Sequence, residues 1–231
     1  MQTSQDKLGL IFEDDQILVR FGQRGVTPDT YKQTYPQYDF LRIRQTHSDI
    51  CIAASPMAHA TEADAHFTAL PGSALLIATA DCIPLMIHCQ QTQRIAAVHA
   101  GWRGVENQIT VKALQQLIAS GSSENKFSFY FGPHIGSASF DVDEDVCVRL
   151  KKSSCNLRDD DYIARRNGKY FIDLQQIVIS QIQHICGEKS NIFPSRVDTK
   201  THPDFHSYRR DGQTGERNWS WIVLKIFSDQ R

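Results

Sequence analysis

The sequence predicts an α/β protein that forms a single domain over residues 1–231, with mixed β-sheets flanked by helices. Three observations lead to this prediction. Several short runs rich in Ile, Val, Leu and Phe have the length and composition of strands. Two longer stretches place their apolar residues at helical spacing and lie between such runs, an alternation typical of α/β folds. No internal repeat, low-complexity tract or Pro/Gly/Ser-rich linker divides the chain, so we expect one domain.

Eight runs are predicted to be strands, and their number indicates substantial sheet. They are Ile17–Phe21, Phe40–Arg44, Ala74–Thr79, Ile83–His88, Ile95–His99, Phe127–Phe131, Tyr170–Asp173 and Trp219–Phe227.

Two stretches are predicted to be helices. After Gly104, apolar residues from Val105 to Ile118 fall largely at helical spacing, and Gly121 follows as a stop signal. The second helix covers Leu174–Ile185, with Asp173 as its N-cap and Gly187 just beyond its end.

Composition and charge exclude several classes of protein. With 41% hydrophobic and 22% charged residues, the chain is neither disordered, collagen-like nor a coiled coil. Lys and Arg number 25 against 26 for Asp and Glu, so the formal net charge is -1. This balance lacks the basic excess that binds nucleic acid or anionic membranes, and we expect neither partner. Any phosphate must therefore be bound by local groups.

The cellular location is predicted from hydropathy and cysteine usage. Residues 1–7 are polar, and no apolar run approaches 18 residues, so we expect a cytoplasmic protein that is neither secreted nor membrane-spanning. The six cysteines include no CxxC pair and are interpreted as reduced thiols. They are Cys51, Cys82, Cys89, Cys147, Cys155 and Cys186.

Three predicted strands are each followed, or ended, by a residue that can bind a metal ion. These residues are His47, Cys82 and His99. Two imidazoles and one thiolate suit Zn²⁺, and three protein ligands leave a fourth position for water or substrate, as in catalytic zinc sites. Packed or exposed side chains without a metal are the alternative, and spacing does not decide between them.

A glycine-containing turn after His99 is a candidate anion site. Gly101 and Gly104 permit close backbone approach, Arg103 lies in the same turn, and the helix expected to begin near Val105 offers N–H groups. A tight strand-to-helix turn without a ligand is the alternative. A second turn, Gly132–Gly136, could line the same cleft or be purely structural.

The segment near the C-terminus offers two guanidinium groups, Arg209 and Arg210, beside Tyr208. This combination suits phosphate or carboxylate, and a solvated basic loop is the alternative. His202 and His206 have the spacing of a helical metal pair, but Pro203 argues against a continuous helix, so we do not interpret them as ligands.

Five motifs together resemble one known protein family. QTH, TADCIPLMI, HAGWRG, GPHIG and SYRRDGQTG occur in this order, and the resemblance extends from about Phe21 to the end of the chain. The family is named variously polyphenol oxidase, laccase-domain protein, peptidoglycan editing factor or purine nucleoside phosphorylase. Its members bind zinc through the residues that correspond here to His47, Cys82 and His99. The resemblance also implies a single α/β domain.

The activity implied by this resemblance is phosphorolysis of adenosine, inosine and methylthioadenosine, together with deamination of adenosine. The expected partners are therefore a small-molecule nucleoside and phosphate, while the oligomeric state is left open. Other members have been assigned copper-dependent phenol oxidation or removal of a wrong amino acid from a peptidoglycan precursor. The sequence departs from the family pattern at Val19–Val26 and at Asp198–Thr199, which affects the substrate contacts expected from those regions.

Alternative chemistries can be compared at the same residues. The nine histidines form no HxH pair, which disfavours a multicopper oxidase, although copper could occupy a His₂Cys site. The H-x-E and P-C-x-x-C pattern of cytidine deaminases is absent. A Cys-His hydrolase would use Cys82 as nucleophile and His99 as base, which excludes zinc on that thiolate. A purely structural zinc would need a fourth protein ligand.

The preferred interpretation is a zinc enzyme that acts on purine nucleosides. Asp81 is a candidate acid, base or supporting group beside Cys82, and a turn carboxylate is the alternative. Arg103, Arg209 and Arg210 are the candidate phosphate-binding residues.

Overall fold

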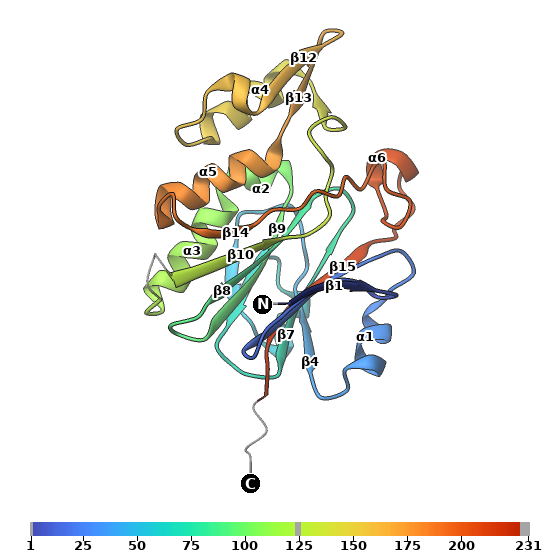
Figure 1. The fold of residues 1–231 in the computed structure, drawn as a ribbon, viewed down its shortest axis with the longest axis vertical. Coiled ribbons are helices and arrows are strands. Elements are labelled where there is room, and N and C mark those ends of the chain that lie inside the picture. The colour runs from blue at the N-terminus through green and yellow to red at the C-terminus, as the bar shows by residue number, and fades with distance from the viewer. Residues whose placement is uncertain (1, 123–125, 227–231) are drawn as a thin grey trace.

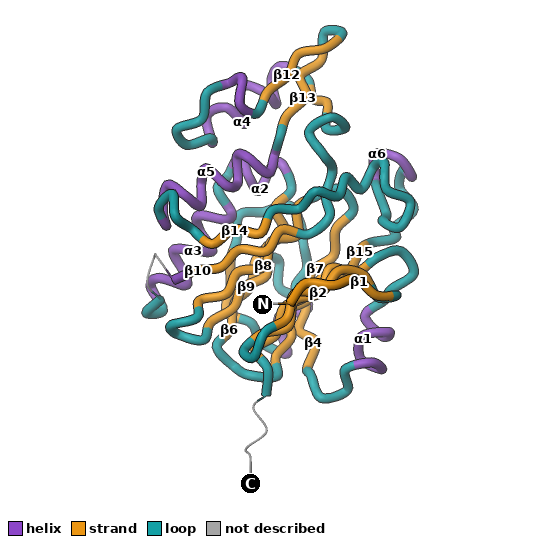
Figure 2. The backbone as a smooth tube through the Cα atoms, in the orientation of Figure 1, coloured by secondary structure: helices purple, strands orange, loops and turns teal. Residues whose placement is uncertain are grey.

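The computed structural model describes residues 2–122 and 126–226, and two six-stranded sheets form its centre (Figures 1 and 2). In the first sheet β4 runs parallel to β7, and every other neighbouring pair is antiparallel. Its strands in spatial order are β1 (Gln2–Asp6), β2 (Gly9–Glu13), β3 (Ile17–Gly22), β15 (Asn218–Leu224), β7 (Ser73–Thr79) and β4 (Asp39–Arg42).

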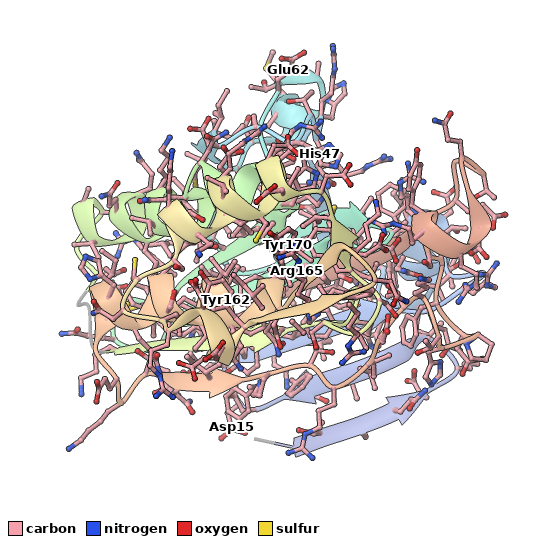
Figure 3. All side chains as sticks on the ribbon, turned by 90° about the horizontal axis from the view of Figure 1, so that it is seen from above. Asp15, His47, Glu62, Tyr162, Arg165 and Tyr170 are labelled. Atoms are coloured by element: carbon pink, nitrogen blue, oxygen red, sulfur yellow. The ribbon has the colours of Figure 1, made fainter. Side chains whose placement is uncertain are left out.

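The second sheet is also mixed, with parallel pairs at its two edges and antiparallel pairs between them. Its strands are β14 (Asn191–Phe193), β10 (Phe127–Phe131), β8 (Ile83–Cys89), β9 (Arg94–Ala100), β6 (Ala65–Thr68) and β5 (Cys51–Ala53). A small antiparallel sheet, marked by Arg165 and Tyr170 in Figure 3, contains β11 (Asp141–Val142), β13 (Lys169–Ile172) and β12 (Ile163–Arg166).

The helices lie mainly outside the two large sheets. They are α1 (Pro28–Thr34), α2 (Trp102–Glu106), α3 (Ile109–Ala119), α4 (Glu144–Ser153), α5 (Leu174–Cys186) and α6 (Tyr208–Asp211), with 3-10 turns at Pro56–Ala60 and Asp159–Asp161. None of the helices in the described residues is long and apolar enough to cross a membrane.

Alternation along the strands creates a buried layer on each side of the second sheet. On β8, Leu85 and Ile87 pack against α3 and α5, whereas Met86 faces the first sheet. Side chains of β3, β7 and β15 complete the layer between the sheets. The outer face of the first sheet packs around Trp221, which contacts the ring of Tyr31 in α1. This arrangement confirms the predicted α/β fold of mixed sheets flanked by helices.

The predicted strands are all present, and their ends differ from the prediction by at most two residues. The exception is the C-terminal strand, which ends three residues early and whose last predicted residue, Phe227, lies outside the described part. The helix at Leu174 is also confirmed, and Asp173 caps it by accepting a hydrogen bond from the N–H of Gln176. The helix predicted from Val105 is confirmed over Ile109–Ala119, but the prediction that it is one continuous helix is wrong. Gln108 has a φ of 61°, in the left-handed region, and this separates α2 from α3.

Candidate active site

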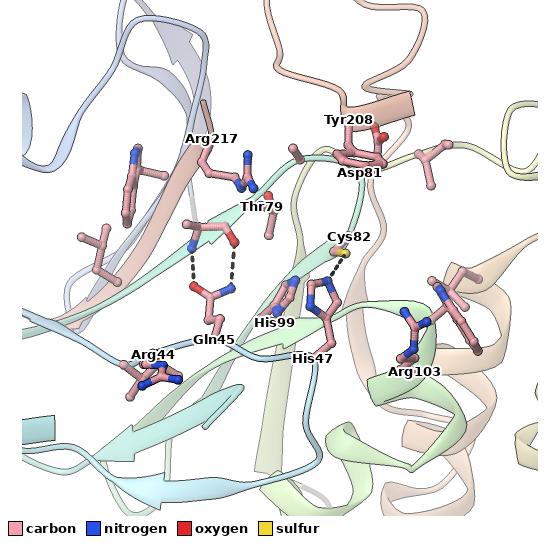
Figure 4. Close-up of a pocket in the computed structure, with 18 of the residues that line it drawn as sticks. Arg44, Gln45, His47, Thr79, Asp81, Cys82, His99, Arg103, Tyr208 and Arg217 are labelled. Atoms are coloured by element: carbon pink, nitrogen blue, oxygen red, sulfur yellow. Dashed lines mark hydrogen bonds between the residues drawn. The ribbon is translucent and has the colours of Figure 1, made fainter. Parts of the chain in front are cut away.

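Three loops or strand ends bring His47, Cys82 and His99 together, as the sequence predicted (Figure 4). His47 follows β4, Cys82 lies in the turn between β7 and β8, and His99 is in β9. Their candidate ligand atoms all lie within 4.8 Å of one another. The Nε2 atom of His47 is 3.8 Å from the Sγ atom of Cys82. This is the one group of at least three metal-binding side chains in residues 2–122 and 126–226.

The backbone around His47 is held in an uncommon conformation, with a φ of 60°. The Gln45 side chain supports it by pairing with the backbone of Ala78, where both hydrogen bonds are 2.8 Å long (Figure 4). Asp64 accepts further hydrogen bonds from the backbone N–H groups of Thr46, His47 and Ser48. Contacts within the chain therefore place the His47 ring.

Asp64 also orients the His99 ring. Its Oδ1 atom lies 2.6 Å from His99 Nδ1, and both residues are buried. Because a carboxylate only accepts hydrogen bonds, Nδ1 must carry a proton, and Nε2 is therefore the ring nitrogen that can bind a metal ion once it has released its own proton. Burial opposes ionisation of Asp64, but hydrogen bonds from His99 and Ser48 lower its pKa to about 2.

Cys82 has the electrostatic setting of a metal-binding thiolate. Burial opposes its ionisation, but the charge of His99 and the hydrogen bond from His47 lower the pKa of the thiol to about 6. Burial likewise opposes a charged His99, yet Cys82 and Asp64 raise its pKa to about 9.

Gly101 packs directly against two of the ligands. A Cβ atom at this position would lie 2.9 Å from His47 Cδ2 and 3.0 Å from Cys82 Sγ. Gly101 was expected to allow close approach to its backbone, and the groups that approach it are the side chains of His47 and Cys82.

The group lines an open pocket of about 750 Å³. Five arginines line the same pocket, whereas Asp81 is its one lining carboxylate in the described residues. The arginines are Arg42, Arg44, Arg103, Arg209 and Arg217. Trp102, Trp219, Phe140 and Tyr208 add aromatic surface. A pocket with this lining suits an anionic ligand that also carries a planar ring.

Asp81 lies in the pocket wall, and both of its carboxylate oxygens already accept hydrogen bonds. Oδ1 accepts from the Thr199 hydroxyl at 2.6 Å, and Oδ2 accepts from the backbone N–H of Arg209 at 2.7 Å. Asp81 thus joins the turn that carries Cys82 to the C-terminal segment.

The predicted phosphate-binding arginines have different surroundings. Arg103 lines the pocket with its guanidinium 4.4 Å from the centre of the Trp102 ring, and it has no ion pair within the described residues. Arg209 also lines the pocket but pairs with Asp141 at 2.5 Å. Arg210 is not among the lining residues, and its guanidinium donates to backbone carbonyls that include those of Thr199 and Phe205.

The helix expected to begin near Val105 begins three residues earlier, so the Val105 N–H is not one of the free donors at a helix start. The first helix of this region, α2, begins at Trp102 and has five residues. The Val105 N–H already donates to the Gly101 carbonyl.

The two other histidine and glycine patterns are accounted for by local structure. His202 and His206 lie outside any helix and belong to no metal-binding group within the described residues. In the turn of residues 132–136, Ile135 lines the pocket and its N–H donates to the Asp81 carbonyl.

Asp64, Arg42, Arg44 and Arg217 are the residues of this region that the sequence did not indicate. Asp64 lies between two alanines just before β6. A single carboxylate among small apolar residues gives only weak evidence that the side chain is buried. The arginines meet only because β4, β7 and β15 are neighbours in the first sheet.

A sequence model described as "Multi-copper polyphenol oxidoreductase laccase" matches residues 8–225. The chain belongs to this family. The resemblance drawn from the five motifs is thereby confirmed. A relative named purine nucleoside phosphorylase, from Deinococcus radiodurans, is 32% identical over 187 residues, which cover 80% of this chain and 70% of that protein.

Two further comparisons concern activity and fold. The protein named adenosine deaminase RL5, from an unknown prokaryotic organism, is 31% identical over 166 residues, or 70% of this chain and 62% of that protein. The crystal structure of the Bacillus licheniformis hypothetical protein YfiH matches with a TM-score of 0.82 at 22% identity, covering 90% of this chain and 93% of that one. That similarity shows a shared fold.

Proposed function

We propose that this protein is a zinc-dependent purine nucleoside phosphorylase that also deaminates adenosine. The observation that carries the proposal is the His47–Cys82–His99 group, which is oriented by Asp64 within an arginine-lined pocket. The names of the Deinococcus radiodurans and RL5 relatives support the two activities.

The donor set fits zinc in type and number. Two imidazoles and one thiolate are common zinc ligands, and three protein ligands leave a position for substrate. A zinc ion bound there would act as a Lewis acid toward the nucleoside. Asp64 keeps the proton of His99 on Nδ1, while Gln45 and Gly101 keep His47 in position.

Phosphorolysis transfers the ribosyl C1′ from the purine nitrogen to a phosphate oxygen, which releases the base and ribose 1-phosphate. The phosphate must be held near the metal group and beside the sugar. Arg103 suits this role because it follows His99 in the chain by four residues, lines the pocket and forms no ion pair in the described part. Arg209 adds positive charge from the other segment, although its guanidinium already pairs with Asp141.

Asp81 and Arg210 are assigned supporting roles. Asp81 holds the C-terminal segment against the turn that carries Cys82, through Thr199 and Arg209. Arg210 stabilises the loop that precedes it by donating to backbone carbonyls. Substituting Asp81 or Arg210 would therefore reduce substrate use by changing the shape of the pocket.

A cysteine hydrolase is the second candidate, because Cys82, His99 and Asp64 also have the composition of a nucleophile, base and orienting carboxylate. Such an enzyme has no need of His47. The uncommon backbone conformation of His47, and the number of contacts that maintain it, favour the metal site instead.

A copper-dependent phenol oxidase is less well supported. A multicopper enzyme needs a trinuclear cluster in addition to a mononuclear site, and residues 2–122 and 126–226 contain one metal-binding group. Copper can occupy a His₂Cys site, so phenol oxidation is expected only from copper-loaded protein.

The decisive experiment is a product assay by mass spectrometry on protein of defined metal content. Zinc-loaded protein should convert adenosine to adenine and ribose 1-phosphate when phosphate is present, and to inosine with or without it. Cys82→Ala should lose most of the zinc and both activities. Activity that survives chelation but is abolished by alkylation of Cys82 would instead establish the cysteine hydrolase.

A further inference from the structure

Three arginines lie on one wall of the pocket, away from Arg103. In the first sheet Arg42 of β4 is paired with Leu76 of β7, and two residues further along β7, Ala78 is paired with Trp219 of β15. Because strand side chains alternate, Arg42 and Trp219 project from the same face of the sheet. Arg44 follows Arg42 by two residues and Arg217 precedes Trp219 by two, and all four line the pocket.

These guanidinium groups are poorly neutralised. Arg42 lies 4.5 Å from the centre of the Trp219 ring and has no ion pair among the described residues. Arg217 donates to the backbone carbonyl of Glu216 at 2.7 Å. Within the described part of the chain, Arg44 is the one of the three that has a carboxylate partner, Glu62, and both side chains are more than half exposed. Such an exposed ion pair contributes little, so a bound anion can compete with it.

The wall is continuous with the metal-binding group. Arg44 and His47 belong to one short segment, and Ala78 and Cys82 belong to another, while Gln45 bonds the two segments together. Figure 4 shows Arg44 and Arg217 on one side of the His47 and His99 rings and Arg103 on the opposite side. Figure 3 places Glu62, the partner of Arg44, on the same side of the molecule as His47. A ligand at the metal group could therefore reach one cationic wall while phosphate occupies the other.

We propose that Arg42, Arg44 and Arg217 form a second oxyanion subsite, which holds a phosphate group in addition to the phosphate placed at Arg103. Guanidinium groups bind phosphate oxygens through paired, charge-assisted hydrogen bonds. Trp219 and Leu76 provide an apolar surface beside them. The occupant is either the phosphate of a phosphorylated nucleoside or a second inorganic phosphate. This inference rests on the proposed function for the nucleoside part of the ligand.

Isothermal titration calorimetry tests the subsite without requiring turnover. The ligands are adenosine, adenosine 5′-monophosphate and inorganic phosphate, each titrated into the zinc-loaded wild type, Arg42→Gln and Arg217→Gln. Arg196→Gln is the charge-matched control, because Arg196 is exposed and does not line the pocket. Arg217→Gln is the more secure variant, since among the described residues the Arg217 guanidinium donates a hydrogen bond only to the carbonyl of its neighbour Glu216.

If the subsite holds a phosphorylated nucleoside, the wild type should bind the monophosphate roughly tenfold or more tightly than adenosine. Arg42→Gln and Arg217→Gln should lose this difference while Arg196→Gln retains it. If the subsite holds free phosphate, the two variants should bind inorganic phosphate more weakly. The ratio of the affinities for adenosine 5′-monophosphate and adenosine should then be the same as in the wild type. Affinities for all three ligands that match those of Arg196→Gln would overturn the proposal. Failure of adenosine turnover in the product assay would instead count against the proposed function.

Discussion

Replacing Asp64 with asparagine tests how the site prepares His99 for a metal ion. Asp64 Oδ2 accepts from Thr46, from the Ser48 N–H and from the Ser48 hydroxyl, whereas Oδ1 accepts from His47 and His99. In Asp64→Asn the remaining carbonyl oxygen should therefore face the Oδ2 donors. The new NH₂ group then faces His99 Nδ1, which must become an acceptor. In the neutral ring the one remaining proton then lies on Nε2, the atom needed by the metal.

The expected loss follows from the bonds that are removed. One charge-assisted hydrogen bond contributes about 1.5–3 kcal/mol, and each 1.4 kcal/mol is tenfold in affinity. Zinc affinity should therefore fall roughly tenfold to a hundredfold, the range expected when a carboxylate behind a metal-binding histidine is removed. Competition with a chromophoric chelator measures the affinity, and nitrogen-15 NMR of the histidines reports the tautomer.

Ser48→Ala is the matched control. It removes one hydrogen bond to Asp64 Oδ2 and leaves the contact with His99. We expect its zinc affinity to stay close to that of the wild type. Equal zinc affinities in Asp64→Asn and the wild type, or equal losses in the two variants, would refute the tautomer argument.

Three further predictions concern packing, phosphate use and pH. Gly101→Ala should release zinc, because the new Cβ displaces His47 and Cys82. Gly104→Ala is the control and should retain zinc, because its Cβ would instead lie 3.1 Å from Ile109. Elemental analysis measures the zinc content of both variants. Arg103→Lys should impair phosphorolysis, and Arg103→Ala should impair it roughly tenfold to a hundredfold. Deamination measured without phosphate should be affected less. Equal losses in both reactions would assign Arg103 to a shared or structural role. Finally, burial opposes ionisation of Asp64, but its hydrogen bonds lower its pKa from 3.8 to about 2. The ionised Asp64 therefore stabilises the folded protein fully above about pH 4, and this contribution is lost as the pH falls through about 2. Between these pH values the free energy of unfolding should fall by about 2 kcal/mol more in wild type than in Asp64→Asn, as measured by urea denaturation; parallel curves would contradict this.

Most of the central sheet strands could be predicted because burial gives them continuous apolar runs. Polar or very short strands gave weaker signals. β1 is polar and has β2 as its one neighbour in the described residues, while β5 and β14 have three residues each. The break between α2 and α3 was also hidden, because apolar spacing continues through residues 105–118 although Gln108 adopts a left-handed backbone conformation. Local patterns record which side chains are buried and contain less information on backbone conformation.

The metal-binding side chains were predictable because each lies in a distinctive motif at a strand end. Their supporting groups were not. The role of Asp64 depends on hydrogen bonds to two separate segments, residues 46–48 and His99, that only the folded chain brings together. The wall formed by Arg42, Arg44 and Arg217 depends on β4 and β15 flanking β7, a pairing between distant parts of the chain.

The contacts made by Asp64, Gln45 and Gly101 have a consequence for metal selection. These contacts hold the donor atoms through bonds and packing within the polypeptide, and none of them is specific to one metal ion. Two imidazoles and a thiolate accept several transition metals, and copper outcompetes zinc on affinity alone. The ion acquired should therefore follow the supply in the growth medium and the expression host. Preparations of this one sequence should differ in their chemistry according to how the cells were grown.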